Sequence, residues 1–232
     1  MKFGVVIFPG SNCDHDIIYV LKEIIGIEVV ELWHKDTDLQ NVDCVVLPGG
    51  FSYGDYLRSG ALAQFSPIME SVIQFANKGG YVLGICNGFQ ILCEAGLLPG
   101  ALLPNEKQKF VCKNVFITPD AIKESPNKHL QDDIPLKIPV AHGEGRFYAK
   151  NEDLADIRFN HQVLYRYCNE NGTISSEFNP NGSAENIASI CNENRNVIGI
   201  MPHPERASDE ELGNTDGLHI LLSIIRMVRD KD

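Results

Sequence analysis

Short apolar runs alternate with amphipathic stretches along the N-terminal half of the chain, and this alternation limits the possible folds more than any other feature. The apolar runs predict strands at residues 3–8, 27–33, 43–50 and 81–85. Apolar residues at helical spacing predict helices at 16–25, within 57–79 and at 89–98. Strands that are apolar on both faces and alternate with helices are typical of a doubly wound parallel sheet. We therefore predict an α/β, flavodoxin-like fold with a mostly parallel sheet.

The second half of the chain has a less regular pattern. Shorter strands, some of them antiparallel, are expected at 110–117, 136–149, 173–178 and 187–192. Another buried strand is expected at 196–201, and the chain closes with an expected helix at 216–229. We interpret the shorter strands as a small β-rich insertion in a single domain that spans residues 1–232.

The composition narrows the possible partners and compartments. The 232 residues carry a formal net charge of −11, which disfavours nucleic acid and anionic membranes as partners because both bind clustered Lys and Arg. The first apolar run is too short for a signal peptide or a membrane span. The seven cysteines form no C-x-x-C pair, which argues against zinc ribbons and thioredoxin-type motifs. We expect a reduced, cytoplasmic protein.

Chemically reactive side chains and glycines follow the expected strands. In open α/β sheets, binding sites form outside the carboxyl ends of the strands. The segments in these positions are Pro9–Asp14, Pro48–Gly54, Cys86–Gly88 and Pro202–Glu205. Together they hold a cysteine, a histidine, a carboxylate and a glycine loop, which are the components of a cysteine-nucleophile site.

Cys86 is the strongest candidate for the nucleophile. It lies in a Gly-x-Cys-x-Gly pattern at an expected strand-to-helix junction, which is the thiol form of a nucleophile elbow. Glycines on both sides allow the sharp turn, and a helix N-terminus favours the thiolate. The alternative interpretation is a small buried residue in a tight turn. Cys13 is the second choice of reactive thiol, because it also follows an expected strand.

His203 and Glu205 are the candidate base and its partner. Residues two apart in an extended segment point to the same side, and Pro202 and Pro204 stiffen this one. A carboxylate that binds one imidazole nitrogen orients the ring and leaves the other nitrogen for the thiol. A surface His–Glu pair in a loop is the alternative.

The glycine loop at 47–50 is expected to lie beside Cys86, because the third and fourth strands are neighbours in a flavodoxin-like order. The backbone N–H groups of Gly50 and Asn87 could then form an oxyanion hole. A phosphate loop is the alternative, although the chain has no G-x-x-x-x-G-K-[ST] motif. We expect no metal site, although His142 and Glu144 are possible ligands by residue type.

These motifs resemble a known family. The segments GICNGFQ (84–90), PHPE (202–205) and LPGG (47–50) resemble those of the class I (triad) glutamine amidotransferases. Further segments are similar to those of the glutaminase subunits of phosphoribosylformylglycinamidine synthase, a purine-pathway enzyme: FPGSNCDHD (8–16), PGGFSYGDYLRSGA (48–61), PVAHGEGRF (139–147) and MPHPER (201–206). The resemblance covers nearly the whole chain.

The resemblance implies a role for each matching residue. Cys86 would attack the side-chain amide of glutamine, form a thioester and release ammonia. His203 would act as general acid and base, and Glu205 would orient it. The N–H groups of Gly50 and Asn87 would stabilise the oxyanion, and Gln90 would help to hold L-glutamine. The resemblance gives Arg58, His142 and Glu144 no assigned role.

The resemblance also implies partners. This chain would carry no cofactor, because ATP and Mg would be used by a larger synthetase subunit that receives the ammonia, and a small third subunit is expected as well. We expect the partner-binding face at the loops 51–58 and 139–147, and low glutaminase activity without the partner. Two rival functions stay open: another thiol hydrolase or peptidase of similar fold, and a non-catalytic flavodoxin-like binding module.

Overall fold

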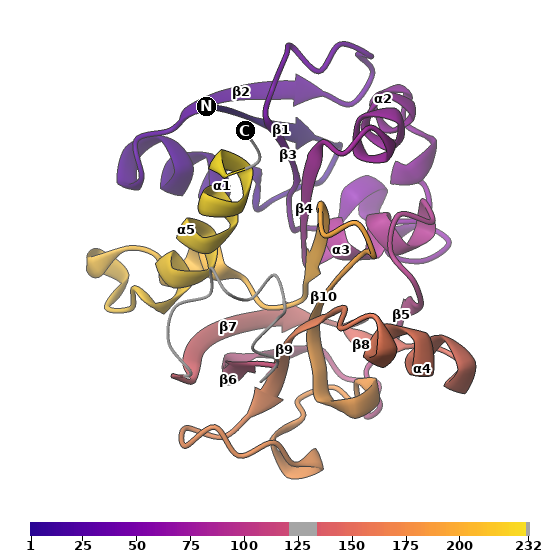
Figure 1. The fold of residues 1–232 in the computed structure, drawn as a ribbon, viewed down its shortest axis with the longest axis vertical. Coiled ribbons are helices and arrows are strands. Elements are labelled where there is room, and N and C mark those ends of the chain that lie inside the picture. Colours follow the sequence, from indigo (N-terminus) through magenta and orange to yellow (C-terminus); the bar gives the residue numbers. More distant parts are fainter. Residues whose placement is uncertain (121–133, 231–232) are drawn as a thin grey trace. The chain divides into compact units, whose positions relative to one another are not determined.

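A computed structural model describes residues 1–120 and 134–230 (Figure 1). The chain divides into two compact units. The first consists of Met1–Leu98 and Asn196–Ile200, and the second of Pro99–Arg195 and Met201–Asp232. The predicted single domain over 1–232 stays a prediction, and each unit is described by itself below.

The first unit contains a parallel sheet. Its strands, in spatial order, are β2 (Glu28–Trp33), β1 (Lys2–Ile7), β3 (Cys44–Leu47), β4 (Tyr81–Ile85) and β11 (Val197–Ile200). Each neighbouring pair is parallel. This order is the flavodoxin-like one, so the predicted α/β fold with a doubly wound parallel sheet is confirmed. Every residue of β3 and β11 is buried, as continuous apolar runs require.

Helices connect these strands, with boundaries that differ from the predicted ones. They are α1 (Asp14–Tyr19), continued by a π-helical segment (Val20–Ile24), α2 (Pro67–Asn77) and α3 (Asn87–Glu94), with short 3-10 turns at Ser52–Asp55 and Ala63–Phe65. The helix expected within 57–79 begins only at Pro67. Ser66 is extended (φ −64°, ψ 139°), and a proline at the first helical position is already set for the helix.

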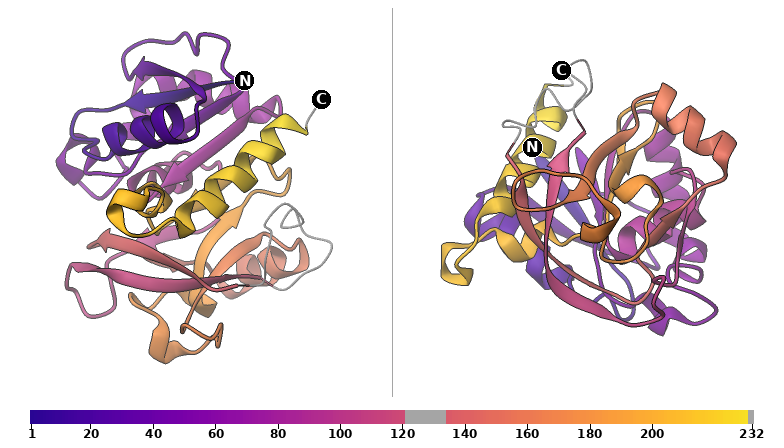
Figure 2. Two further views of the ribbon diagram at one scale, coloured as in Figure 1. Left: turned by 90° about the vertical axis from the view of Figure 1, so that its left-hand side faces the viewer. Right: turned by 90° about the horizontal axis from the view of Figure 1, so that it is seen from below.

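The second unit contains an antiparallel sheet (Figure 2). Its strands, in spatial order, are β10 (Ile187–Cys191), β9 (Val163–Cys168), β6 (Val111–Pro119) and β7 (Leu136–His142). All three neighbouring pairs are antiparallel. A separate two-stranded sheet pairs β5 (Ala101–Leu103) with β8 (Arg146–Tyr148). The unit therefore contains the β-rich insertion that the sequence predicts.

Two helices complete the second unit, α4 (Asn151–Phe159) and α5 (Asp216–Arg229). Helix α5 packs against β7 and against the 3-10 turn Pro204–Ala207. Gly217 makes this contact possible, because a Cβ there would lie 1.9 Å from the carbonyl oxygen of Pro204. A side chain at this position would push the helix away from the segment that carries His203 and Glu205.

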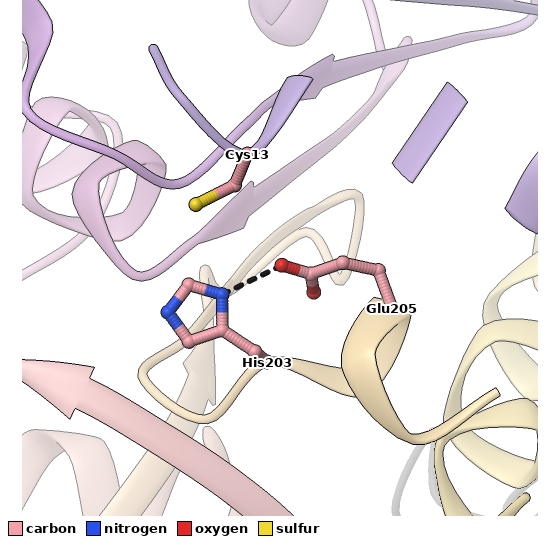
Figure 3. A group of neighbouring side chains, drawn as sticks. All are labelled: Cys13, His203 and Glu205. Carbon is pink, nitrogen blue, oxygen red and sulfur yellow. Dashed lines mark hydrogen bonds and ion pairs between the residues drawn. The ribbon is translucent and has the colours of Figure 1, made fainter. Parts of the chain in front are cut away.

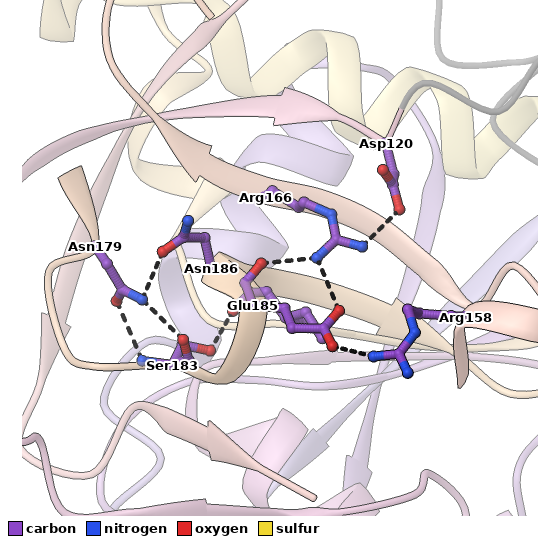
Figure 4. Close-up of polar contacts among 8 residues, drawn as sticks. Asp120, Arg158, Arg166, Asn179, Ser183, Glu185 and Asn186 are labelled. Atoms are coloured by element: carbon purple, nitrogen blue, oxygen red, sulfur yellow. Dashed lines mark hydrogen bonds and ion pairs between the residues drawn. The ribbon is translucent and has the colours of Figure 1, made fainter. Parts of the chain in front are cut away.

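An ion-pair network joins several loops of the second unit (Figure 4). Arg166 lies 3.0 Å from the carboxylate of Asp120 and donates to the backbone oxygen of Glu185 at 2.7 Å. The carboxylate of Glu185 also accepts from Arg158. Arg166 lies on β9 and Arg158 on α4, whereas Asp120 directly follows β6 and Glu185 lies in the 3-10 turn before β10. The network therefore ties the turn before β10 to the sheet.

Several predictions for the second unit are wrong. Residues 173–178 form no strand, because Ser176–Phe178 is a 3-10 turn. The strand expected at 136–149 is two strands, β7 and β8, which belong to different sheets. The elements α4, β9 and β5 were not predicted at all. The low amphipathicity of α4 and the partial alternation of β9 give only weak periodic signals.

No helix in the described part of the chain is long and apolar enough to cross a membrane. All seven cysteines lie among the described residues, and no disulfide joins any two of them.

Candidate active site

Cys86 occupies a strained turn between β4 and α3. Its backbone is at φ 48° and ψ −102°, a conformation that costs an L-residue of the order of 1–3 kcal/mol. Two glycines make the turn possible: a Cβ on Gly84 would lie 2.6 Å from the carbonyl oxygen of Gly88, and one on Gly88 would lie 1.9 Å from that of Leu47. The turn therefore has the geometry of the nucleophile elbow that the sequence predicts.

The elbow is tied to the neighbouring strand. The N–H of Cys86 donates to the carbonyl of Ile200, the last residue of β11, at 2.7 Å. The strands β4 and β11 run parallel with Ile85 opposite Ile200. In the sequence, His203 follows three residues after the end of β11. The strand that precedes the candidate base thus fixes the backbone of the candidate nucleophile.

The glycine loop after β3 is held by the loop after β1. Gly50 has φ 124°, and a Cβ there would lie 2.4 Å from the backbone nitrogen of Asn12. The N–H of Phe51 donates to the carbonyl of Gly10 at 2.9 Å, and that of Cys13 donates to Gly49 at 3.4 Å. Only glycine fits at position 50, because both the positive φ and the close backbone exclude a side chain.

Asn87 joins this loop to the first turn of α3. Its Oδ1 accepts from the N–H of Ser52 at 3.1 Å, and its Nδ2 donates to the Oε1 of Gln90 at 2.8 Å. Asn87 and Gln90 are both buried. Since β3 and β4 are neighbours, the glycine loop, Asn87 and Gln90 gather at the carboxyl ends of these strands, as expected.

His203 and Glu205 form a buried pair in the second unit (Figure 3). The Nδ1 of His203 lies 2.6 Å from Oε1 of Glu205, and each side chain is 1% exposed. The N–H of His203 donates to the carbonyl of Pro139 at 2.8 Å. The side-by-side placement was predicted, but its cause differs: Pro204–Ala207 is a 3-10 turn, not an extended segment. A carboxylate at this distance orients the ring.

His142 is enclosed by two asparagines in the same unit. Its Nδ1 lies 3.1 Å from Oδ1 of Asn105, and its Nε2 lies 3.4 Å from Nδ2 of Asn181. Burial, and to a smaller extent the neighbouring His203, lower the pKa of His142 to about 4. His142 is therefore neutral at physiological pH. Both ring nitrogens face hydrogen-bond partners, which leaves no lone pair for the metal ligand that its residue type allowed.

Sequence patterns do not predict the contacts of Asn105 and Asn181 with His142. Asn105 also donates to the backbone carbonyl of His142 at 2.9 Å and accepts from the N–H of Gly145 at 3.0 Å. Asn181 donates to the carbonyl of Gly145 at 2.8 Å. The segment 139–147 stands out in the sequence, but only the fold brings it together with Asn105 and Asn181.

The structure also places three other residues that the sequence analysis singled out, Cys13, Arg58 and Glu144. Cys13 is buried at the start of α1 with φ −102°, so its backbone shows none of the strain found at Cys86. Arg58 binds Glu94 at the end of α3 through two bonds, from Nε to Oε1 at 2.7 Å and between the terminal nitrogen and Oε2 at 2.5 Å. Glu144 is half-buried in the segment after β7.

Comparison with known proteins identifies the class. Residues 1–216 match the model of the CobB/CobQ-like glutamine amidotransferase domain. The chain belongs to this family of enzymes. A glutamine amidotransferase from Thermotoga maritima, 14% identical, shares the fold with a TM-score of 0.57 over 99% of this chain and 94% of that one.

More similar proteins narrow the comparison. "Phosphoribosylformylglycinamidine synthase subunit PurQ" of Koribacter versatilis is 54% identical over 225 residues, covering 97% of each chain. The protein of the same name from Nostoc sp. is 51% identical over 228 residues, covering 98% of each. The structure of "PurLQS from Thermotoga maritima" matches at 40% identity with a TM-score of 0.84, covering 98% of each chain. The resemblance stated from the motifs is thereby confirmed.

Proposed function

We propose that this chain is the glutaminase subunit of a phosphoribosylformylglycinamidine synthase. It hydrolyses glutamine to glutamate and ammonia. The ammonia passes to a synthetase that converts formylglycinamide ribonucleotide and ATP to formylglycinamidine ribonucleotide in purine biosynthesis. The observation that carries the proposal is the strained Cys86 elbow, in a chain that is 54% and 51% identical, over 97% and 98% of its length, to two proteins named phosphoribosylformylglycinamidine synthase subunit PurQ.

In the first half of the reaction, Cys86 acts as the nucleophile. Its sulfur attacks the side-chain amide carbon of glutamine, and His203 takes the thiol proton. The negative charge that develops on the amide oxygen is stabilised by the N–H groups of Gly50 and Asn87. His203 then gives its proton to the leaving nitrogen, the carbon–nitrogen bond breaks, and ammonia and a thioester on Cys86 result.

In the second half, water replaces ammonia. His203 takes a proton from the water as its oxygen attacks the thioester carbon, the carbon–sulfur bond breaks, and the thiolate of Cys86 regains the proton. Glutamate leaves. Throughout, Glu205 holds the imidazole through the 2.6 Å bond to Nδ1 and stabilises its protonated form. Gln90 helps to hold the substrate glutamine at the start of α3.

The synthetase and a small third subunit are the proposed partners, and ATP and Mg are used by the synthetase. The loop 51–58 supports the first of these, because it exposes Tyr56 at 74% and Leu57 at 86%. Large apolar side chains exposed together mark interaction sites. The other expected loop, 139–147, offers less, because Val140, His142 and Phe147 are buried. We propose a cytoplasmic location, supported by the absence of disulfides among the seven cysteines.

A reconstitution assay tests the function. The purified chain is mixed with the larger synthetase subunit, the small subunit, glutamine, ATP and formylglycinamide ribonucleotide, and the amidine product is measured. The complete mixture should form product, and the chain alone should release little ammonia from glutamine. Absence of product from the complete mixture, when added ammonia does give product, would refute the assignment.

A pair of variants tests the partner face. Leu57→Asp should weaken binding to the synthetase, measured by calorimetry or light scattering, because it places a charge in an apolar contact. Phe159→Asp is the matched control: Phe159 is 82% exposed on α4, outside the proposed face. Equal affinities for Leu57→Asp and the parent chain would exclude the loop 51–58.

A further inference from the structure

The side-chain amide of Asn87 connects two groups that the proposed reaction uses. On one side it accepts from the N–H of Ser52, two residues after Gly50. On the other side it donates to Gln90, the residue proposed to hold glutamine. A third, longer contact of 3.5 Å runs from Nδ2 to Oδ1 of Asp55. The resemblance assigned Asn87 only a backbone N–H, so this use of its side chain is additional.

The two ends of the Asn87 amide cannot be exchanged. Its oxygen faces a backbone N–H, which can only donate, and its nitrogen faces the oxygens of Gln90 and Asp55. Turning the Asn87 amide over would place N–H against N–H and oxygen against oxygen. The backbone of Ser52 therefore sets the orientation of Asn87, and Asn87 in turn sets the orientation of Gln90.

The burial of Asn87 and Gln90 makes their hydrogen bonds hard to replace. Asn87 is 1% exposed and Gln90 is 5% exposed, so water cannot readily replace a lost partner. With Oε1 of Gln90 bound to Asn87, the NH₂ end of the Gln90 amide is directed away from Asn87. A donor in that position suits an acceptor on the ligand, such as a carbonyl or carboxylate oxygen of glutamine.

We infer that Asn87 is a positioning residue that acts through both of its amide atoms. Its nitrogen orients the Gln90 amide for glutamine binding, and its oxygen holds the loop that presents the Gly50 N–H. The inference rests on the proposed function for the identity of the ligand. We call the bond from the Asn87 nitrogen to Gln90 the Gln90 arm, and the bond from the N–H of Ser52 to the Asn87 oxygen the Ser52 arm. Loss of the Gln90 arm should weaken glutamine binding, and loss of both arms should also slow the reaction at Cys86.

The test uses covalent labelling of Cys86 in the assembled complex by the diazoketone analogue of glutamine. Asn87→Asp keeps an acceptor for Ser52 but removes the donor to Gln90, whose amide must then turn over. The half-saturating concentration of the analogue should rise about tenfold or more, with a smaller change in the maximal labelling rate. Asn87→Leu removes both arms and should change both quantities.

The pH profile separates orientation from a general structural defect. A protonated carboxyl at position 87 can again donate to Oε1 of Gln90, and the neighbouring Asp55 favours protonation. The binding defect of Asn87→Asp should therefore shrink as the pH is lowered from about 9 to about 6. Asn87→Leu has no titrating group there and should show a defect that does not shrink.

Two further variants keep the test decisive. Asn196→Asp is the matched control, because Asn196 is a buried asparagine of the same unit that donates to the carbonyls of Ala76 and Gly80. It should lower thermal stability without changing the half-saturating concentration. If Asn87→Asp does not fold, a double variant, Asn87→Asp with Asp55→Asn, replaces it. This exchange restores a donor–acceptor pair between positions 55 and 87, but position 87 still offers Gln90 no donor. The binding defect should therefore persist.

Binding of the analogue within twofold of the parent in Asn87→Asp or the exchange variant would overturn the inference. A defect of constant size at all pH values, with a stability loss like that of Asn196→Asp, would overturn it too. Failure of the proposed function has a different signature: no amidine product in the reconstitution assay, while labelling of Cys86 and its dependence on Asn87 remain measurable.

Discussion

The two units hold their candidate catalytic groups in different ways. In the first unit, the candidate groups Gly50 and Cys86 have positive φ, and so do Tyr53, Asp55 and Leu57 in the loop that follows Gly50. In the second unit, His203 and Glu205 are held by hydrogen bonds and burial, with no positive φ among residues 201–205. The candidate nucleophile is thus presented by backbone geometry, and the candidate base is held in a buried polar pair.

The sheets explain the difference. Parallel strands end at one edge, so the first unit can place several short loops side by side, and these loops must turn sharply. The antiparallel sheet of the second unit offers no such common edge, and its polar groups are fixed through side chains, as His142 is by Asn105 and Asn181. We therefore expect the glycine turns at Gly50 and Gly88 to matter for the candidate groups of the first unit, and the buried asparagines around His142 to matter in the second.

The largest expected effect tests whether the strained elbow carries the nucleophile. Cys86→Ala removes the attacking sulfur and should lower glutamine-dependent ammonia release by more than about 10⁴-fold. Cys13→Ala is the control and should retain most of the activity. The measurement is ammonia release by the assembled complex. Full activity in Cys86→Ala, or complete loss in Cys13→Ala alone, would move the nucleophile away from the elbow.

The next effect compares two glycines beside candidate site residues. Gly88→Ala would bring a Cβ to 1.9 Å from the carbonyl oxygen of Leu47, so the strand β3 or helix α3 must move. A loss of about 3–5 kcal/mol in the free energy of unfolding, or failure to fold, is expected. Gly143→Ala in the second unit meets nothing closer than 3.7 Å and should cost less than about 1 kcal/mol. Urea unfolding measures both, and similar losses would contradict the comparison.

An effect of intermediate size tests the polar packing in the second unit. Below its ordinary pKa of 6.5, His142 takes up a proton in the unfolded chain but not in the folded one until about pH 4. Its contribution to the free energy of unfolding is therefore lost as the pH falls from 6.5 to 4, by up to about 3 kcal/mol. His142→Gln should flatten this part of the pH dependence, measured by urea unfolding. An unchanged slope in His142→Gln would contradict this assignment.

The smallest effect tests how the strained loop of the first unit is anchored. The hydroxyl of Tyr53 lies 2.8 Å from Nδ1 of His34 and 2.8 Å from Oγ of Ser66. Tyr53→Phe removes both bonds and should lower the free energy of unfolding by about 1–2 kcal/mol. Tyr56→Phe, on the exposed side of the same loop, should change it by less than about 0.5 kcal/mol. Chemical unfolding distinguishes the two, and equal values would show that the loop does not depend on this anchor.

Sequence patterns predicted the first unit well and the second unit poorly. The strands β1, β2, β3, β4 and β11 are short apolar runs, and their order is the flavodoxin-like one that the sequence predicts. In the second unit, the strand β5 has only three residues, and the helix α4 buries only Ile157. Such segments owe their structure to partners far along the chain, so their local pattern is weak.

The candidate site also contains features that the sequence predicts and features that it does not. The sequence by itself determined the nucleophile elbow and the His203–Glu205 pair, because both are encoded within a few residues: glycines around Cys86, and a histidine two positions before a carboxylate. Local sterics explain the turn at Cys86. The His203–Glu205 pair forms across a 3-10 turn and not in the extended segment that the sequence predicts.

Only the tertiary structure decided how these groups are supported. Asn87 meets Ser52 across 35 positions of the sequence, and His142 meets Asn105 across 37. An asparagine in a short motif has four hydrogen-bonding sites, and the sequence does not say which partners they meet. The partners are determined when the sheets form and bury the amides, because a buried donor or acceptor must form a hydrogen bond with a group that the fold places beside it.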